Sequence, residues 1–551
     1  MSSPAPADQV AWPILSASEM SEIATFGVER AAVDGELLFA TGEPSDQFFV
    51  VLDGEVEIVG QDGKQEVVLA EYGPGGFVGE LSLLTGQRRF VTGRVKRAGR
   101  VLVIEQAEFR RLMSVRPALA ETIFRALMAR REILRTGAGA QAIRIIGSRY
   151  SPEAMSLRSF AEHSRLAHTW IDIEDADDVE QLLGNMGITR QDTPVVITPT
   201  GVLRDATVGE LAEKLGLTFK PVPGYTFDLV VVGSGPGGLA AAVYGASEGL
   251  STVCLDAVSV GGQAGASSRI ENYAGFPNGI SGADLTARTA AQALRLGARL
   301  NAPCEVVGLR PEVGFQVIVL NDGSEIATRA VIVASGARYR RLAARGLDRF
   351  EGAGVYYAAT DLEARVCAGA PVLVVGGGNS AGQAAIYLAQ HDSHVTIAIR
   401  RDSLVETMSQ YLIARIEAHP QIDLLGGVEV EELAGQDHLE RVVLTHTATG
   451  ARVEIASSGL FCFIGALPAT EWLGASVLLD EHGFVLTDRQ VHGRDGMLAE
   501  PLPFETSTPG VFAVGDVRSG SMKRVAAAVG EGSSAVRSVH ERLATLVGGG
   551  V

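Results

Sequence analysis

The stretch FDLVVVGSGPGGLAAAVYGASEGLSTVCLDA, residues 227–257, decides the fold of the larger half of this 551-residue chain. Its apolar start, Phe227–Val232, predicts a buried strand that leads through a glycine-rich turn into a helix and a second strand. Gly233 makes the turn, Gly235 lets the backbone approach a pyrophosphate, and Gly238 allows the helix to pack closely on the strand. The spacing therefore predicts a dinucleotide-binding unit.

The same unit carries two further features of a dinucleotide site. The pyrophosphate would sit at the N-terminus of the helix, where free N–H groups and the helix dipole favour an anion. Asp256 ends the second strand, roughly 20 residues after the turn, and is placed to bind an adenosine ribose hydroxyl. The alternative is a turn whose glycines serve packing alone, and the strand, the helix and the acid together disfavour it.

A second fingerprint occupies residues 372–403, VLVVGGGNSAGQAAIYLAQHDSHVTIAIRRDS. Gly376 and Gly378 repeat the spacing, with alanine in the third place. The next strand ends in Arg400 and Arg401 rather than in an acid. An acid would repel a 2′-phosphate whereas arginine pairs with it, so this site favours NADPH over NADH. The alternative is a pair of solvated surface arginines.

The composition excludes several classes of partner. The formal net charge is −18, and because phosphate binding needs a basic footprint, we expect neither nucleic acid nor an anionic membrane surface as a partner. No apolar run reaches the length of a transmembrane helix and no signal peptide is recognisable, so we expect a cytoplasmic protein. The chain has four cysteines that are far apart and form no C-x-x-C pair: Cys254, Cys304, Cys367 and Cys462. This spacing excludes a local redox dithiol and the usual zinc ribbons, and no metal is expected.

Residues 1–137 show short alternating strands separated by Gly, Asp and Pro turns, which predicts a β-roll or barrel. A helical stretch follows, with Phe109, Leu112 and Met113 on one face. This order resembles the cyclic-nucleotide-binding domain, and GFVGELSLLTGQRRFVT, residues 76–92, resembles its phosphate-binding cassette.

The cassette resemblance implies three contacts to a cyclic nucleotide. Gly79 would open a short helix whose N–H groups face the cyclic phosphate, Glu80 would accept the ribose 2′-hydroxyl, and Arg89 would pair with the phosphate. Where small alanines usually follow this arginine, the chain has Phe90 and Val91, whose bulk would crowd the ligand. The alternative is a β-roll retained as a docking or dimerisation module.

Residues 138–220 alternate strands and helices in an order that resembles the thioredoxin or glutaredoxin fold. Thr193-Pro194 falls where that family has its cis-proline. Ser151 and Ala154 occupy the positions of the family's two cysteines. A serine forms no mixed disulfide, so we expect this domain to be redox-silent.

Two dinucleotide units in one chain, the second inserted in the first, suggest FAD plus NADPH. GGQAGASSRIENYAGFPNGISGADL, the VIVASGA turn and TSTPGVFAVGDVRSGSMKRVAAAVGEG all resemble low-molecular-weight thioredoxin reductase, over residues 226–545. The resemblance implies FAD contacts from residues of both halves of the first unit: Gly233, Gly235, Pro236, Gly238, Asp256, Gly262, Gln263, Asn272, Gly336, Gly515, Asp516, Arg524 and Val525. The corresponding NADPH contacts are Gly376, Gly378, Asn379, Ser380, Arg400 and Arg401.

One motif of that family is missing. Thioredoxin reductases carry C-A-T-C just before the second glycine turn, and here the matching run is Ala358-Ala359-Thr360-Asp361. Disulfide reduction needs an attacking thiolate and a resolving thiol, and neither is present in this run. Cys367 follows, and we interpret it as a small buried residue.

The expected fold is a multidomain α/β protein: a β-roll with helices (1–137), a thioredoxin-like domain (138–220), an FAD domain in two parts (226–341 and 466–545) and an NADPH domain (342–465). We expect a homodimeric FAD-dependent NADPH oxidoreductase that passes electrons to an unidentified acceptor, under the control of a cyclic nucleotide if the cassette binds one. One alternative is a cyclic-nucleotide- or redox-responsive sensor with little turnover. Another is a thioredoxin-disulfide reductase that uses a partner's thiols. No residue of the chain is assigned as catalytic.

Overall fold

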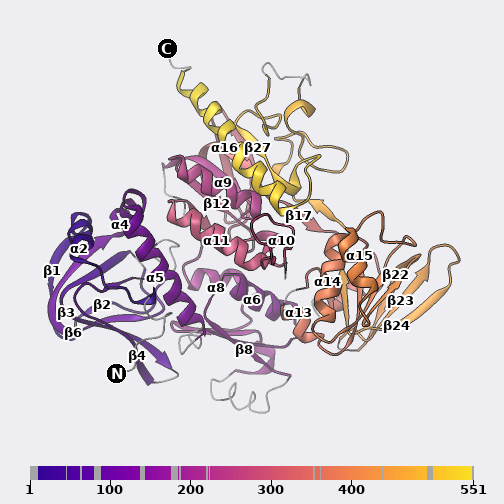
Figure 1. The fold of residues 1–551 in the computed structure, drawn as a ribbon, viewed down its shortest axis with the longest axis horizontal. Coiled ribbons are helices and arrows are strands. Elements are labelled where there is room, and N and C mark those ends of the chain that lie inside the picture. The colour runs from indigo at the N-terminus through magenta and orange to yellow at the C-terminus, as the bar shows by residue number, and fades with distance from the viewer. Residues whose placement is uncertain are drawn as a thin grey trace.

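The computed structural model describes residues 10–44, 46–62, 65–79, 83, 88–136, 143–149, 151–164, 166–174, 184, 188–218, 221, 224–267, 269–351, 354–359, 361–436, 438–492 and 500–548. The chain runs from an N-terminal β-roll through a small α/β domain into two larger α/β units (Figure 1). Among the helices of these residues, none has the length and apolar character needed to cross a membrane.

The N-terminal region is an antiparallel β-roll flanked by helices, as predicted (Figure 1). Its strands follow the order β1-β6-β3-β4, with β2 paired to β6 and β5 to β3. Helix α4 buries Phe109, Leu112 and Met113 on the roll, which confirms the predicted apolar face. The elements are α2 (Ala17–Ile23), η1 (Ala24–Phe26), β1 (Val28–Ala32), β2 (Leu37–Phe39), β3 (Gln47–Asp62), β4 (Gln65–Tyr72), β5 (Phe77–Val78), β6 (Thr92–Glu105), α4 (Gln106–Val115) and α5 (Pro117–Thr136).

The second domain, residues 143–218, is a four-stranded sheet with strand order β10-β9-β7-β8. Strand β7 is parallel to β8 and antiparallel to β9. The Thr193–Pro194 peptide bond is cis, as expected. The alternating order of this domain also predicts a helix over residues 175–187, a range in which only Gly184 is among the described residues. The elements are β7 (Ile143–Gly147), α6 (Pro152–His163), β8 (His168–Asp172), η3 (Arg190–Asp192), β9 (Val195–Thr198), β10 (Gly201–Leu203) and α8 (Val208–Lys214).

The first dinucleotide unit is built on a seven-stranded sheet with a parallel core. Strands β13, β12, β11, β16 and β27 run parallel, and the hairpin β14–β15 continues the sheet beyond β16 in antiparallel pairing. Helices α9, α11 and α16 lie together beside the sheet (Figure 1). The elements are β11 (Thr226–Val232), α9 (Pro236–Ser247), β12 (Thr252–Leu255), α10 (Gly262–Gly265), α11 (Gly282–Arg295), β13 (Arg299–Asn301), β14 (Val306–Glu312), β15 (Phe315–Leu320), β16 (Glu325–Val333), β27 (Val511–Ala513), η6 (Gly515–Val517) and α16 (Val525–Gly548).

The second dinucleotide unit is inserted between β16 and β27 of the first. Its five-stranded parallel sheet has the order β18-β25-β19-β20-β21, and a three-stranded antiparallel sheet, β22-β23-β24, lies beside it. The elements are α12 (Leu347–Phe350), β18 (Val355–Tyr356), α13 (Asp361–Val366), β19 (Pro371–Val375), α14 (Asn379–Ala389), β20 (His394–Ala398), α15 (Gln410–Glu417), β21 (Ile422–Leu425), β22 (Val428–Ala434), β23 (Arg441–His446), β24 (Arg452–Ala456) and β25 (Gly459–Cys462); η4 (Glu471–Leu473) and η5 (Asp488–Gln490) follow it in the chain.

Two kinds of contact join the dinucleotide units. The chain crosses between them twice, and the two crossings pair as an antiparallel ribbon of β17 (Ala337–Tyr339) and β26 (Ala466–Pro468). Away from this ribbon, Arg415 of α15 donates to the carboxylate of Glu271 in the first unit at 3.0 and 3.1 Å. The ribbon is the covalent connection between the units, and the ion pair is a separate non-covalent link.

Candidate dinucleotide sites and the cleft between them

The first glycine turn has the geometry that its spacing predicts. Gly233 has a φ of +104°, and a Cβ there would lie 2.2 Å from the carbonyl oxygen of Ala334. A Cβ on Gly238 would lie 1.8 Å from the carbonyl oxygen of Gly233. A Cβ on Gly235, the N-cap of α9, would meet nothing within 4 Å. The two outer glycines are therefore required by packing, and the middle one faces free space at a helix N-terminus, where a pyrophosphate fits.

Asp256 lies beside this turn, and its carboxylate has several donors within the protein. One oxygen accepts hydrogen bonds from the backbone N–H and the hydroxyl of Ser234, at 2.7 and 2.8 Å. The other accepts from the N–H groups of Val258 and Ser259, at 3.0 and 3.2 Å. These four donors occupy the roughly four lone-pair sites of the carboxylate, so a ribose hydroxyl would have to replace or share one of them. The acid also fixes the turn, a role that the spacing rule does not reveal.

The second glycine turn repeats this arrangement. Gly376 has a φ of +135°, and a Cβ there would lie 2.2 Å from the carbonyl oxygen of Phe463. A Cβ on Gly378, the N-cap of α14, would meet nothing within 4 Å. Asn379 is turned inward, because its side-chain oxygen accepts the N–H of Ser409 at 2.7 Å.

Arg400 and Arg401 follow β20 and are exposed, as a 2′-phosphate contact requires. Arg400 is 3.7 Å from Glu429, with 77% of its side chain exposed, and Arg401 is 2.7 Å from Glu406. Exposed pairs of this kind contribute little free energy, so either guanidinium can change partner when a phosphate arrives.

The other predicted FAD contacts from the first half of the unit lie in the loop at Gly262, at Asn272 and at Gly336. A Cβ on Gly262 would lie 2.9 Å from the Cα of Gly235, so this loop packs directly on the glycine turn. Gln263 donates from its side-chain amide to the carbonyl of Ala337 on the crossover ribbon. Gly336 has a φ of +67° and faces open space, and Asn272 is exposed nearby in the sequence. Gly262 and Gln263 thus contact the first glycine turn and the crossover ribbon, respectively.

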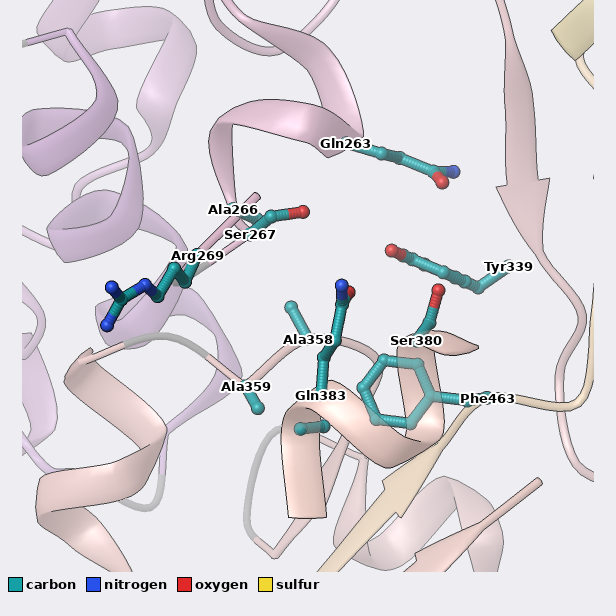
Figure 2. A pocket seen from close by; sticks show the side chains of 11 residues that line it. Gln263, Ala266, Ser267, Arg269, Tyr339, Ala358, Ala359, Ser380, Gln383 and Phe463 are labelled. Carbon is teal, nitrogen blue, oxygen red and sulfur yellow. The ribbon is translucent and has the colours of Figure 1, made fainter. Parts of the chain in front are cut away.

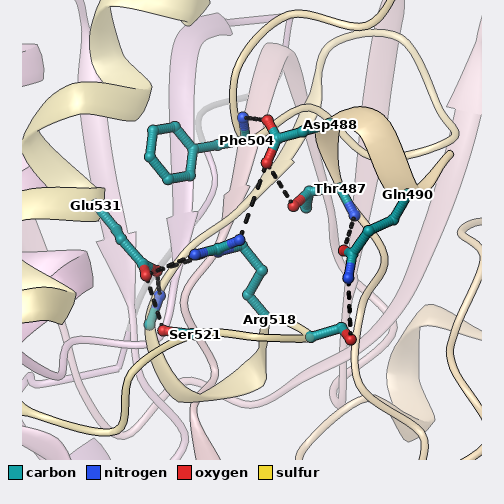
Figure 3. A network of polar contacts seen from close by, with 9 residues as sticks. Thr487, Asp488, Gln490, Phe504, Arg518, Ser521 and Glu531 are labelled. Atoms are coloured by element: carbon teal, nitrogen blue, oxygen red, sulfur yellow. Dashed lines mark hydrogen bonds and ion pairs between the residues drawn. The ribbon is translucent and has the colours of Figure 1, made fainter. Parts of the chain in front are cut away.

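The turn Gly515–Asp516 is held by a partly buried acid that the sequence interpretation missed (Figure 3). Glu531 of α16 accepts the N–H of Gly515 at 2.7 Å, the guanidinium of Arg518 at 2.7 Å and the hydroxyl of Ser521 at 2.8 Å. Burial raises the pKa of Asp516, while Lys523 opposes this shift. A lone acid among the small residues of VAAAVGEGSSAV was the available signal for Glu531.

The same network ties in the segment at 487–506. Arg518 lies 3.9 Å from Asp488, whose carboxylate accepts the N–H of Phe504, and the guanidinium stacks over the Phe504 ring at 5.4 Å. The described part of this insertion therefore supports the Gly515 turn. Of the three remaining predicted contacts, Pro236 begins α9, Arg524 is exposed, and Val525 packs against the cluster of Ile270, Ile280 and Leu285.

A cleft lies where the two dinucleotide units face each other (Figure 2). It encloses about 50 Å³, and Figure 2 shows hydroxyl and amide groups pointing into it from both units. Ala358 and Ala359 form part of its wall, and Asp361 begins α13, while Thr360 lies outside the described residues. The other lining residues are Gln263, Ala266, Ser267, Arg269, Tyr339, Ser380, Gln383, Ala384 and Phe463. Ala358 and Ala359, which the sequence resemblance aligns with the family's dithiol motif, thus lie at the junction of the two units.

All four cysteine thiols are buried and unpaired as disulfides. Burial raises the pKa of Cys304, Cys367 and Cys462 to about 12, with smaller contributions from neighbouring carboxylates, and it also raises the pKa of Cys254. The thiolate is the nucleophilic form, so none of these groups is a nucleophile near neutral pH.

This burial gives a prediction for thiol labelling. The native protein at pH 8 is expected to bind essentially no thiol reagent, because the raised pKa values keep the thiols protonated and burial excludes the reagent. After denaturation, all four cysteines are expected to react. A colorimetric disulfide assay with and without denaturant measures both values. Rapid labelling of a native thiol after NADPH reduction would contradict the absence of a redox-active cysteine.

The arginine of the β-roll cassette is not placed as the family resemblance implies for a residue that pairs with a phosphate. Arg89 is 4% exposed and donates to the backbone carbonyls of Pro44 and Gln47, at 3.2 and 2.9 Å. Gly79 packs against Phe48, whose ring a Cβ would approach to 2.5 Å. Glu80 lies outside the described residues.

Comparison with known proteins agrees with this architecture. The family model described as pyridine nucleotide-disulphide oxidoreductase matches residues 227–532, and the cyclic nucleotide-binding domain model matches residues 29–116. Thioredoxin reductase of Bacillus subtilis (strain 168) is 33% identical over 323 residues, which cover 57% of this chain and 94% of that protein. The 34.2 kDa protein in the rubredoxin operon of Clostridium pasteurianum is 30% identical over 308 residues, 56% of this chain and 94% of that protein.

Two solved thioredoxin reductases have the same fold over the dinucleotide units. The Lactococcus lactis enzyme in its FR conformation aligns with a TM-score of 0.52 and 31% identity, covering 58% of this chain and 100% of that structure. The enzyme of T. acidophilum aligns with a TM-score of 0.52 and 30% identity, covering 57% and 98%. The chain belongs to the pyridine nucleotide-disulphide oxidoreductases. It is an NAD(P)H-dependent flavin oxidoreductase of thioredoxin-reductase type, its cofactors are FAD and NADPH, and it carries a cyclic nucleotide-binding domain.

Proposed function

We propose that this oxidoreductase passes electrons from FAD directly to an acceptor other than an internal disulfide. The observation that carries the proposal is the wall of the cleft, where Ala358 and Ala359 stand in the run that matches the family's dithiol. The thiol chemistry of Cys367, the nearest cysteine in sequence, is suppressed by burial. Bound FAD would take a hydride from NADPH and release the electrons to the acceptor.

The residues of the chain would hold the two cofactors and shape the cleft between them. Gly235 and Gly378 leave room for the two pyrophosphates at the N-termini of α9 and α14. Gln263, Tyr339 and Ser380 supply polar groups to the junction. A quinone, an iron–sulfur or flavin protein, oxygen or a bound small molecule would suit this role as acceptor.

An anaerobic half-reaction tests the proposal. Titration of the FAD-loaded protein with NADPH is expected to bleach the flavin absorbance with one molar equivalent, and a screen of reoxidants is expected to restore it. Reduction of thioredoxin or of an aromatic disulfide is expected to be close to zero. A flavin that stays oxidised under NADPH would overturn the proposal, as would fast disulfide turnover.

The nucleotide preference gives a second prediction. Replacing both arginines, Arg400→Gln and Arg401→Gln, is expected to weaken NADPH binding about tenfold and to leave NADH binding nearly unchanged, because only NADPH carries the 2′-phosphate. KM for each nucleotide in the flavin half-reaction measures the effect. Arg441→Gln, an exposed arginine on β23 paired at 3.5 Å with Glu454, is the control. Equal losses with both nucleotides would show that the arginines do not read the phosphate.

Three further features belong to the same proposal. The second domain is a redox-silent relative of thioredoxin, supported by its strand order and by Ser151, whose hydroxyl caps α6 by accepting the N–H of Ala154 at 3.2 Å. The dinucleotide units extend over 226–341 with 466–545, and over 342–465. The protein acts as a homodimer, which light scattering of the purified chain tests.

A further inference from the structure

The guanidinium of Arg89 is committed to the β-roll itself. Its Nε and one terminal nitrogen, which form the edge used for bidentate contacts to a phosphate, donate instead to the carbonyls of Pro44 and Gln47. One face of the guanidinium lies 4.0 Å from the centre of the Phe39 ring. Asp46 adds a counter-charge at 3.7 Å. The guanidinium of Arg89 therefore finds its hydrogen-bond and charge partners within the β-roll, without a ligand.

The neighbouring residues bind the second domain. Phe90 packs against the hydrophobic core of that domain, which includes Ile143, Leu157 and Leu211. The backbone N–H of Arg88 donates to the carbonyl of Leu215, just after α8, at 2.9 Å. These two contacts come from the end of the cassette, where the family has proline and small residues.

A second stretch of the β-roll meets the same domain. A Cβ on Gly42 would lie 2.6 Å from the methyl group of Thr200. The two segments of the chain therefore approach each other as closely as a glycine permits. Arg88 links this turn to the cassette, because its guanidinium donates to the carbonyl of Gly42 at 2.9 Å. Gly42 and Arg88 of the β-roll and Thr200 of the second domain also line one open groove between the two domains.

We propose that the segment Arg88–Phe90 is a fixed joint between the β-roll and the second domain, and that Arg89 is the internal anchor of this joint instead of the phosphate contact of a cyclic nucleotide. The bulk of Phe90, which would crowd a nucleotide, is the contact that makes the joint. The β-roll is thus a docking module for a domain of its own chain.

The joint also determines what the second domain presents to the reductase. Helix α6 lies beside α13, the helix that begins at Asp361 in the replaced dithiol run (Figure 1). Burial lowers the pKa of Arg158 on α6, and the positive charge of Arg365 on α13 lowers it further against the opposing effect of Glu162. The second domain, which the joint holds on the β-roll, therefore lies within electrostatic range of α13 in the NADPH-binding unit.

Backbone hydrogen exchange of the full FAD-loaded chain tests the joint. Phe90→Ala is expected to speed exchange at the Arg88 amide at least tenfold and to leave flavin absorbance unchanged. Phe315→Ala, which removes a partly exposed aromatic ring from the β14–β15 hairpin, is the control. Thr200→Arg, which inserts bulk opposite Gly42 and changes no residue of the cassette itself, is expected to have the same effect as Phe90→Ala and covers the case in which that variant fails to fold.

Calorimetry with cyclic AMP and cyclic GMP completes the test. The wild-type chain is expected to show no binding to either nucleotide, and Arg89→Lys is expected to lower the unfolding temperature of the β-roll. Micromolar binding that Arg89→Lys abolishes without a loss of stability would overturn the proposal. Unchanged exchange at Arg88 in both Phe90→Ala and Thr200→Arg would overturn it as well.

Discussion

Gly235→Ala is expected to leave the fold intact and to weaken FAD binding at least tenfold. A Cβ at this position meets nothing within 4 Å, and its φ lies outside the left-handed region, so the folded chain tolerates a methyl group. The methyl group would occupy the space at the N-terminus of α9 that the pyrophosphate needs. Flavin retained after gel filtration, together with the thermal unfolding temperature, measures both effects.

Gly238→Ala is the matched variant at the same turn, and the opposite result is expected. Its Cβ would lie 1.8 Å from the carbonyl oxygen of Gly233, so strand and helix must separate. Overpacking of this kind costs about 1–3 kcal/mol or more, and we expect the unit to lose stability as well as flavin. Gly530→Ala on α16, with nothing within 4 Å, is the control for a glycine in a helix. Normal flavin affinity in Gly235→Ala would show that the space serves another purpose.

Glu531→Ala is expected to raise the dissociation constant of FAD at least tenfold while the rest of the protein stays folded. The carboxylate is the common acceptor for Gly515, Arg518 and Ser521, and its loss leaves the N–H of the flavin-binding turn and a largely buried guanidinium without their main partner. Removing one member of a buried charge pair costs about 3–5 kcal/mol. Equilibrium flavin titration of the apoprotein measures the loss.

Two further variants distinguish an effect on the position of the Gly515 turn from a general loss of protein stability. Glu531→Gln keeps a hydrogen-bond acceptor and is expected to restore part of the flavin affinity. Glu541→Ala removes an exposed acid from the same helix, where it pairs with Arg537, and is expected to bind flavin normally. Unchanged flavin affinity in Glu531→Ala, alongside a lower unfolding temperature, would make this acid a structural residue only.

The glycine turns were predictable because each depends on a few consecutive residues. The spacing of Gly233, Gly235 and Gly238 already indicates at which positions a Cβ would clash and at which one space remains, as the structure shows. The nesting of the second unit followed from the order of the motifs along the chain. The replaced dithiol run was located by resemblance to a family, since no spacing within this sequence marks Ala358 as exceptional.

Contacts between distant segments could not be predicted in this way. Glu531 lies 16 residues from Gly515, and no local pattern says that its carboxylate turns toward that amide. Arg89 is the clearest case, because its carbonyl partners lie more than 40 residues earlier in the chain. A cassette motif gives the identity of such a residue, whereas its partners depend on how the loops of the roll close.

The ion pair between Arg415 and Glu271 has a consequence for how the two dinucleotide units move. It joins them at a distance from the covalent ribbon, so any swing of one unit about that ribbon stretches it. Both side chains are partly open to solvent, and dissolved ions therefore weaken the attraction, with a screening length of about 10 Å at 0.1 M salt and about 3 Å at 1 M. If the two units rotate about the ribbon, this ion pair must break, and the ease of that rotation would then respond to ionic strength.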